Sequence, residues 1–328
     1  MKGYRLGAIG FLVAVFLTAC TNAPEVELPV RECAPLPEKR ACATAFVVDH
    51  QAYVFAGRDS AGVAKNDLWR YTPSTDSWEH LGATPLKPRV NPTSCVREGK
   101  VYIGLGFNGA YWQDSCYLQD FWEYTPSTNS WQRLADYPNA YTDAATSFAG
   151  EGALYVGYGY RWNYRRDMFR YDISLNRWDS IDVGVSFFGY PIRSFGGTGC
   201  TCNGRHFMGT GYYRNNLNWW AELVDGTHWE KRSPVPGRER VLAASTASKD
   251  YIYVVGGLHY GGVNTNGEAL CDIRRYDPTS DRWQFVAVMP EGLYNHVSFA
   301  IDGKVYWGLG EDKDIHVTNR LYCIEEEK

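Results

Sequence analysis

Apolar and polar positions alternate over short stretches of this chain, and the clearest example is Asp120–Pro138. In DFWEYTPSTNSWQRLADYP, two apolar runs around Trp122 and Trp131 flank the polar sequence PSTNS. Proline presets φ there, and Ser, Thr and Asn hydrogen-bond to nearby backbone, so the pattern predicts two short strands joined by a turn. Nearly the same sequence occurs earlier, in Asp67–Pro85 (DLWRYTPSTDSWEHLGATP). The chain therefore has to be interpreted as a repeat.

The repeat can be followed six times. In each unit a strand rich in Tyr ends in a glycine motif, and the aromatic hairpin follows after a variable loop. The six glycine motifs are Tyr53–Gly57, Tyr102–Gly106, Tyr155–Gly159, Phe207–Gly211, Tyr253–Gly257 and Tyr306–Gly310. The hairpin tryptophans are Trp78, Trp131, Trp178, Trp229 and Trp283. Their recurrence every 47–54 residues predicts a repeated unit of strands, with the tryptophans as packing between units.

The sixth unit lacks its last strand. After the final strand signal the chain ends at Lys328, where a turn and a tryptophan strand would otherwise follow. Near the other end, Val30–Pro37 has the same length and the same closing proline as Trp131–Pro138. We therefore predict that Val30–Pro37 forms the outer strand of the sixth unit, where it covers a free sheet edge.

These units resemble the kelch repeat, whose signature is a glycine pair, a Tyr and, about seven residues later, a Trp, with a period near fifty. The matching tyrosines are Tyr71, Tyr124, Tyr171 and Tyr276. Gly256 and Gly257 form a true pair, and the other motifs read Gly-x-Gly or Ala-Gly. The resemblance covers about residues 30–326. It implies that residues 30–328 are an all-β, six-bladed kelch β-propeller, closed by an N-terminal strand in the last blade.

The first residues predict export. Two positive charges precede the apolar run Gly7–Leu17, which is too short for an ordinary membrane-spanning helix. Leu17–Cys20 resembles the lipobox of bacterial lipoproteins, which implies lipidation of Cys20; the alternative is a plain secretory signal. We expect residues 1–20 to be a lipoprotein signal peptide and residues 21–29 a tether. The protein would then be an outer-membrane lipoprotein of the cell envelope, periplasmic or surface-exposed.

Charge and cysteine content restrict the chemistry. With a net charge of −4, the chain lacks the excess of basic residues that is typical of nucleic-acid-binding proteins. Eight cysteines remain after Cys20, and an exported protein can keep disulfides. The predicted register of the last blade puts Cys33 opposite Leu321, with Cys323 two residues further on the same face, so we predict a Cys33–Cys323 disulfide. The seven histidines lack ligand spacing, and we expect no metal site and no cofactor.

Aromatic and polar residues gather in the loops of one predicted face. In kelch propellers the loops after the glycine motif and the blade-joining loops open on the same face, around the central channel. Arginine forks clamp carboxylates and aromatic rings stack on sugars, so this mouth is a predicted ligand site. The expected ligand contacts are Arg40, Arg89, Tyr141, Arg161, Trp162, Tyr164, Tyr212, Arg214, Arg240 and Asn295. In the alternative, the arginines bond to carbonyls of neighbouring blades and the aromatics pack on one another.

Three functions are compatible with this sequence. The first is a binding protein for a glycan or a small anionic ligand, anchored to the membrane by its N-terminal lipid. The segment YTPSTNSWQRLADYP is similar to segments of kelch lipoproteins of Bacteroidetes-type bacteria, which share a scaffold and no particular ligand. The second is an enzyme. The third is a protein–protein interaction module of the outer membrane, for which a large exposed apolar patch would be the sign.

For the enzyme, the relevant relatives are the sialic-acid mutarotases, the N-acetylneuraminate epimerases, which are exported six-bladed kelch proteins. That family carries a Glu and then an Arg after the glycine motif of its fourth blade. Here Gly211 is followed by Tyr212, Tyr213 and Arg214, and the acid directly after a Gly-x-Gly motif is Glu311, in the sixth blade. Galactose oxidase, a seven-bladed kelch enzyme with a copper site of Tyr and His, fits less well. We therefore expect binding without turnover and assign no catalytic residue.

Overall fold

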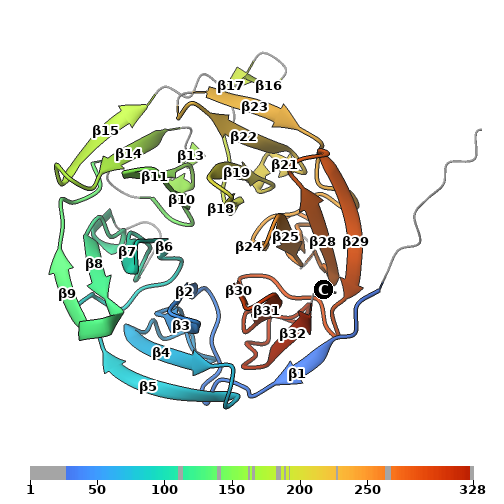
Figure 1. The fold of residues 1–328 in the computed structure, drawn as a ribbon, viewed down its shortest axis with the longest axis horizontal. Helices are drawn as coiled ribbons and strands as arrows, with labels where there is room; N and C mark the ends of the chain where they lie inside the picture. Colours follow the sequence, from blue (N-terminus) through green and yellow to red (C-terminus); the bar gives the residue numbers. More distant parts are fainter. Residues whose placement is uncertain are drawn as a thin grey trace, which may run out of the picture.

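The computed structural model describes residues 27–109, 114–138, 142–161, 163–164, 167–181, 186–187, 190–191, 193–226, 228–262 and 267–325. Within these ranges, six four-stranded antiparallel sheets stand as blades around a central axis (Figure 1). The predicted all-β six-bladed propeller is confirmed. No helix in the described part of the chain is long and apolar enough to cross a membrane. The expected signal peptide and Cys20 lie outside the described residues.

Each blade runs from an inner strand near the axis to an outer strand at the rim (Figure 1). The first blade contains β2 (Thr44–Val48), β3 (Gln51–Phe55), β4 (Asp67–Thr72) and β5 (Ser77–Ala83). The second contains β6 (Thr93–Arg97), β7 (Lys100–Gly104), β8 (Phe121–Thr125) and β9 (Ser130–Arg133). The third contains β10 (Thr146–Gly150), β11 (Ala153–Gly157), β14 (Met168–Asp172) and β15 (Arg177–Ile181).

The second half of the ring repeats this plan. The fourth blade contains β18 (Thr198–Cys202), β19 (Arg205–Gly209), β22 (Trp220–Val224) and β23 (His228–Arg232). The fifth contains β24 (Ala244–Ser248), β25 (Tyr251–Val255), β28 (Asp272–Asp277) and β29 (Arg282–Val288). The sixth contains β30 (Val297–Ile301), β31 (Lys304–Gly308), β32 (Leu321–Glu325) and β1 (Arg31–Cys33).

Short secondary-structure elements lie in the loops between these strands. Four two-stranded hairpins are β12–β13 (Tyr160–Arg161 and Asn163–Tyr164), β16–β17 (Ser186–Phe187 and Tyr190–Pro191), β20–β21 (Tyr212–Tyr213 and Asn215–Asn216) and β26–β27 (Leu258–His259 and Glu268–Ala269). Two 3₁₀ turns are η1 (Asp114–Cys116) and η2 (Pro126–Thr128). The turn η2 is the PSTNS segment, so the hairpin that the sequence pattern predicted is confirmed.

The N-terminal segment closes the ring as predicted. Strand β1 pairs antiparallel with β32, so the first and the last described strands lie side by side (Figure 1). On either side of β1, the Leu28 N–H donates to the carbonyl of Val286, and the Leu36 N–H donates to the carbonyl of Asn319, both at 2.9 Å. The segment therefore joins blade five to blade six as well as covering the edge of β32.

A repeated set of hydrogen bonds explains the Tyr–Trp signature. In blade one, the Tyr71 hydroxyl donates to Asp76 Oδ1 at 2.5 Å, and the Ala34 N–H of the preceding blade donates to the same oxygen at 2.9 Å. Trp78 Nε1 returns a bond to the Ala34 carbonyl at 2.9 Å. The same interblade bonds join Trp178 to Ala135 and Trp283 to Ser233. The recurring tryptophans thus pack between blades, as predicted.

The two cysteines of the closing strand pair lie together. Cys33 stands opposite Leu321 in the register, as expected, and its Sγ lies 3.5 Å from Sγ of Cys323. Both side chains are buried, and both are free thiols here. Sulfurs this close on adjacent strands can bond after a small side-chain adjustment.

The Cys33–Cys323 disulfide stays a prediction. In protein purified from an oxidising compartment, we expect peptide mapping under non-reducing conditions to recover these two cysteines in one linked peptide. The cross-link would close a loop of almost the whole chain, which is where a disulfide restricts the unfolded state most. Recovery of both as free thiols, or of either with another partner, would contradict it.

Candidate functional site

The blade-joining loops meet at the axis, where backbone hydrogen bonds link those of blades four, five, six, one and two in succession. Each loop places one residue there with a positive φ: Cys42, Asn91, Ala144, Gly196, Leu242 and Asn295. We call these six residues the mouth ring. Cys42 donates its N–H to the carbonyl of Asn295 at 2.9 Å, and Asn91 donates to the carbonyl of Cys42 at 2.8 Å. Leu242 bonds to Gly196 and Asn295 bonds to Leu242 in the same way, so equivalent residues of successive blades are linked directly.

The glycine motifs bring a second set of residues beside the mouth ring. At Gly57 and Gly310 the φ angles are +87° and +85°, and an added Cβ would lie 2.5–2.6 Å from a carbonyl oxygen of the blade-joining loop. Only glycine allows the two backbones to approach this closely. The residue after the last glycine therefore pairs with the joining loop in every blade; these residues are Arg58, Phe107, Tyr160, Tyr212, Leu258 and Glu311.

A cavity of about 370 Å³ lies at this mouth. Its polar lining comes from Cys42, Asn91 and Asn295 of the mouth ring together with Arg58 and Asn108. Its apolar lining comes from Val90, Phe107, Phe195 and Leu242, with Ala64 and two glycines. The volume is within the usual range for a small-molecule site, and the combination of apolar walls with a few polar groups is typical of such sites.

An ion pair at the mouth joins the last blade to the first. The Glu311 side chain is 2% exposed, and its Oε1 pairs with the guanidinium of Arg58, which is 35% exposed. Asn295 Nδ2 donates to Glu311 Oε2 at 2.8 Å. Both carboxylate oxygens thus have donors, which compensates for the burial of the charge.

A second carboxylate lies behind the mouth ring. Asp143 is fully buried, and its Oδ1 accepts a 2.9 Å hydrogen bond from Nδ2 of Asn91. Its Oδ2 has no hydrogen-bond partner. Burial raises the pKa of Asp143 to about 6, against the bond from Asn91. Burial likewise raises the pKa of the Cys42 thiol to about 12, against the favourable charge of Arg58, so this thiol is protonated and unreactive at neutral pH.

Three of the predicted ligand residues have a structural role instead. Arg40, Arg89 and Arg240 are fully buried. Each guanidinium forms a two-pronged bond with the aspartate that opens the aromatic hairpin of its blade, which is Asp67, Asp120 or Asp272. Each also donates to the carbonyl before the last glycine of the motif. These side chains are sealed within the scaffold, so their bonds to aspartates and to carbonyls of their own blades place them nearer to the alternative interpretation, in which the arginines serve packing.

The other predicted residues are placed as follows. Asn295 lines the cavity. Tyr212 pairs with Phe195 and packs edge-on against Tyr260 with 5.4 Å between ring centroids, while Arg214 is exposed and lies over the ring of Tyr213. For Arg161 and Tyr164 the structure describes the backbone, in β12 and β13. Tyr141 and Trp162 lie outside the described residues. Among the described ligand predictions, the cavity therefore brings in Asn295 alone.

Several cavity residues were missed at the level of sequence. Arg58, Asn91 and Phe107 do not belong to the repeat signature, and their loops differ in length. A usable signal exists at one position, directly after the last glycine of each motif. There Arg58 and Glu311 are the two charged residues among six, and they belong to the blades that meet at the ring closure.

Below the mouth, hydroxyl side chains line a second cavity of about 200 Å³ along the inner strands. The hydroxyls bond across blades, as between Thr44 and Ser94 and between Thr198 and Ser245, both at 2.6 Å. His296 lines this cavity, and burial lowers the pKa of its imidazole to about 3. A neutral imidazole and hydroxyls suit ordered water in the channel.

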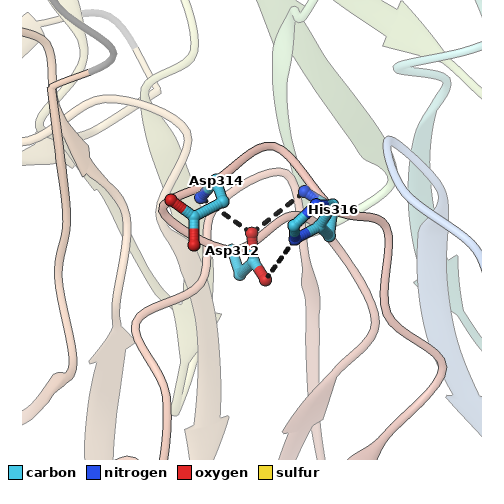
Figure 2. A group of neighbouring side chains, drawn as sticks. All are labelled: Asp312, Asp314 and His316. Atoms are coloured by element: carbon cyan, nitrogen blue, oxygen red, sulfur yellow. Dashed lines mark hydrogen bonds and ion pairs between the residues drawn. The ribbon is translucent and has the colours of Figure 1, made fainter.

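Asp312, Asp314 and His316 gather in the loop after Glu311, where one ligand atom of each lies within 4.8 Å of the others (Figure 2). Asp312 Oδ1 accepts the N–H groups of Asp314 and His316 at 2.8 and 2.9 Å. Blade one forms the same turn at Asp59, whose Oδ1 accepts from the second and fourth residues after it, without a His. The cluster is thus accounted for as a turn, and we assign no metal to it.

Comparisons with known proteins agree with this architecture. Six blades in a ring, with glycine motifs that let the loops at the mouth approach closely, are typical of a kelch-type propeller. The KLHDC2/KLHL20/DRC7 Kelch-repeats domain matches residues 21–211, and the Kelch motif matches residues 239–290. The first match covers more than half of the chain, so the protein belongs to the kelch-repeat family.

The relatives are of more than one kind. Kelch-like protein 35 of Mus musculus is 25% identical over 96% of this chain and 54% of its own length, so the chain spans about half of that relative. The N-acetylneuraminate epimerase of Yersinia enterocolitica is 26% identical over 92% of this chain and 91% of its own length. The solved structure of YjhT has a TM-score of 0.73 at 18% identity, covering 90% of this chain and 97% of that one, which supports the fold.

Proposed function

We propose that this protein is an exported, membrane-anchored kelch propeller that binds a glycan or a small anionic ligand at the mouth of its channel. The observation that carries the proposal is the cavity of about 370 Å³ in which polar residues of the mouth ring face apolar walls from several blades. Residues on a rigid ring are held in place before a ligand arrives, and this lowers the ordering cost of binding. The anchor is the expected lipid on Cys20.

The placement of function at this mouth has a physical basis. The repeat signature uses the outer parts of each blade for packing, and the buried arginines fix the blade-joining loops. The mouth is where the repeats diverge, because the position after the glycine motif holds Arg, Phe, Tyr, Tyr, Leu and Glu in turn. Variable residues on a constant scaffold are the usual carriers of specificity.

A second candidate function is a mutarotase similar to N-acetylneuraminate epimerase, favoured by one observation. Arg58 lines the cavity and pairs with the buried carboxylate of Glu311 beside it. A mutarotase needs a group that takes the proton of the anomeric hydroxyl and one that delivers a proton to the ring oxygen, so that the ring opens and closes on the other face. Glu311 is the residue of this mouth that could exchange such a proton.

We expect the purified protein to bind sugars in calorimetric titrations without accelerating the exchange of their anomers in NMR. Glu311→Gln keeps the size of the side chain and removes the proton acceptor, so in the mutarotase it would abolish exchange and in a binding protein it would change affinity only. Anomer exchange that is accelerated by the protein and lost in Glu311→Gln would establish the enzyme.

Two further outcomes test the rest of the proposal. Absence of binding to neutral and acidic sugars alike would contradict the ligand site and leave the third function, a protein-interaction module, as the better description. A Cys20→Ala variant that stays in the membrane fraction would contradict the lipid anchor.

A further inference from the structure

Two asparagines hold equivalent positions on either side of Cys42 in the mouth ring. Asn91 in blade two and Asn295 in blade six have φ angles of 49° and 51°, and the backbone of Cys42 bonds to both. Both side chains line the cavity. The ring geometry thus presents two carboxamides to the same space from positions one blade away on each side of blade one.

A carboxylate fixes the orientation of each amide. Nδ2 of Asn91 donates to Asp143 at 2.9 Å, and Nδ2 of Asn295 donates to Glu311 at 2.8 Å. A carboxylate accepts hydrogen bonds, so the NH₂ side of the amide must face it and the carbonyl side faces away. Neither Oδ1 has a hydrogen-bond partner, and neither is among the side-chain atoms sealed from solvent. The two Oδ1 atoms are therefore available as acceptors.

Among the described residues that line the cavity, the single charge is balanced by a paired carboxylate. Arg58 is the charged residue among the described residues that line the cavity, and it is paired with the almost fully buried Glu311. The predicted arginines Arg40, Arg89 and Arg240 are buried in pairs with aspartates and contribute no charge here. A carboxylate ligand would meet a guanidinium that is already neutralised, next to Glu311 and two carbonyl oxygens. Repulsion from these groups disfavours an anion.

We propose that the mouth recognises an uncharged, hydroxyl-rich ligand, a neutral sugar or polyol, whose hydroxyls donate to Asn91 Oδ1 and Asn295 Oδ1. The carbon face of such a ring has apolar surface to cover, and Phe107, Phe195 and Leu242 supply the matching walls. This inference rests on the proposed ligand site and narrows its chemistry from glycan or anion to neutral glycan.

The test is a calorimetric comparison of matched sugars that differ in charge, glucose with glucuronate and galactose with galacturonate. We expect at least one neutral sugar to bind about tenfold or more tightly than its acid. Equal or tighter binding of both acids overturns the inference and leaves the ligand site standing. Absence of binding by all four, and by sialic acid, overturns both the inference and the ligand site.

Substitution of one acceptor locates the site. Leu242 and Gly196 occupy the same ring position with φ angles of 56° and 58°, so Asn295→Leu and Asn295→Gly both suit the backbone. Each removes one hydrogen bond to the ligand, and we expect the affinity for the neutral sugar to fall about tenfold. Unchanged affinity in a folded Asn295→Leu or Asn295→Gly overturns the assignment.

Asn203 provides the matched control. It has a φ of 48° and donates Nδ2 to Asp250 Oδ1 at 2.7 Å, but it lies in the turn between β18 and β19 and does not line the cavity. Asn203→Leu and Asn203→Gly should leave the affinity unchanged. An equal loss of affinity in these variants would mean that the effect of Asn295 substitution is general and would overturn the role assigned to its carbonyl.

Discussion

Removal of residues 21–38 is expected to lower the free energy of unfolding by several kcal/mol, because it takes away the outer strand of blade six. The deletion removes Cys33 and Leu36, which are 3% and 0% exposed, together with Leu28 at 7%. Each buried leucine contributes about 1.5–3 kcal/mol through its burial. The deletion also exposes the edge of β32, whose backbone groups bond to β1. Denaturant unfolding, followed by tryptophan fluorescence, measures the loss.

A point variant separates strand loss from chain shortening. Ala34→Pro removes the N–H that donates to Asp76 and disturbs the bond from Trp78, so it should reproduce part of the loss. Glu32→Ala in the same strand is the control, since Glu32 is exposed, and such a change alters stability by about 0.5 kcal/mol or less. An unchanged unfolding midpoint after the deletion would mean that β1 does not hold the ring closed.

The ring closure could be predicted from sequence because the repeat shows which positions are equivalent in different blades. Val30 aligns with Trp131 and Trp229, and four residues further on stand Ala34, Ala135 and Ser233. In the structure these three residues make the same bonds to the next blade. Val30–Pro37 lacks the tryptophan but could still be recognised. The position of Ala34 requires only a backbone N–H and C=O, which every residue but proline supplies.

The role of the arginines was predicted wrongly although its signal was present. Arg40, Arg89 and Arg240 each precede the aspartate that opens the next aromatic hairpin, and this residue recurs as Asp67, Asp120 and Asp272. A recurring Arg with a recurring Asp indicates a pair that belongs to the scaffold, whereas a ligand contact is expected to vary between blades. In blade four, Ser194 replaces the arginine and donates to the corresponding carbonyl, that of Thr210, at 3.2 Å.

The cavity residues could not be predicted because their contacts follow from the closed ring. Arg58 and Glu311 are 253 residues apart in the chain and pair only because blade six lies beside blade one. Asn91 and Asp143 likewise belong to different blades. The two charges directly after the glycine motifs of blades one and six are a partial signal for the first pair, and the sequence offers no such signal for the second. Sequence reasoning predicted that the two sets of loops share one face, and the structure pairs them there, but it selected the residues with the most suggestive chemistry, and several of these serve the scaffold.

The scaffold role of these arginines leads to the second large effect, in Arg89→Ala. Arg89 donates to Asp120 through two nitrogens at 3.0 and 2.8 Å and to the carbonyl of Leu105 at 3.0 Å, all within a fully buried side chain. Burial alone would raise the pKa of Asp120; the hydrogen bonds and charge of Arg89 outweigh it and hold that pKa below its usual value. Loss of one partner of a buried pair costs about 3–5 kcal/mol, which we expect in denaturant unfolding at pH 7.

The dependence on pH and on the partner gives this prediction its controls. The pKa of Asp120 is lower in the folded state than in the unfolded state. The stability that the pair supplies is therefore present above the unfolded pKa and is lost as pH falls through the folded pKa. The difference in free energy of unfolding between wild type and Arg89→Ala should accordingly shrink below about pH 4. Arg89→Met combined with Asp120→Leu should recover much of the loss, because no unpaired charge remains. Arg133→Ala, which breaks the exposed pair with Asp136, should cost less than about 1 kcal/mol. Normal stability of Arg89→Ala with loss of sugar binding would instead return Arg89 to the ligand site.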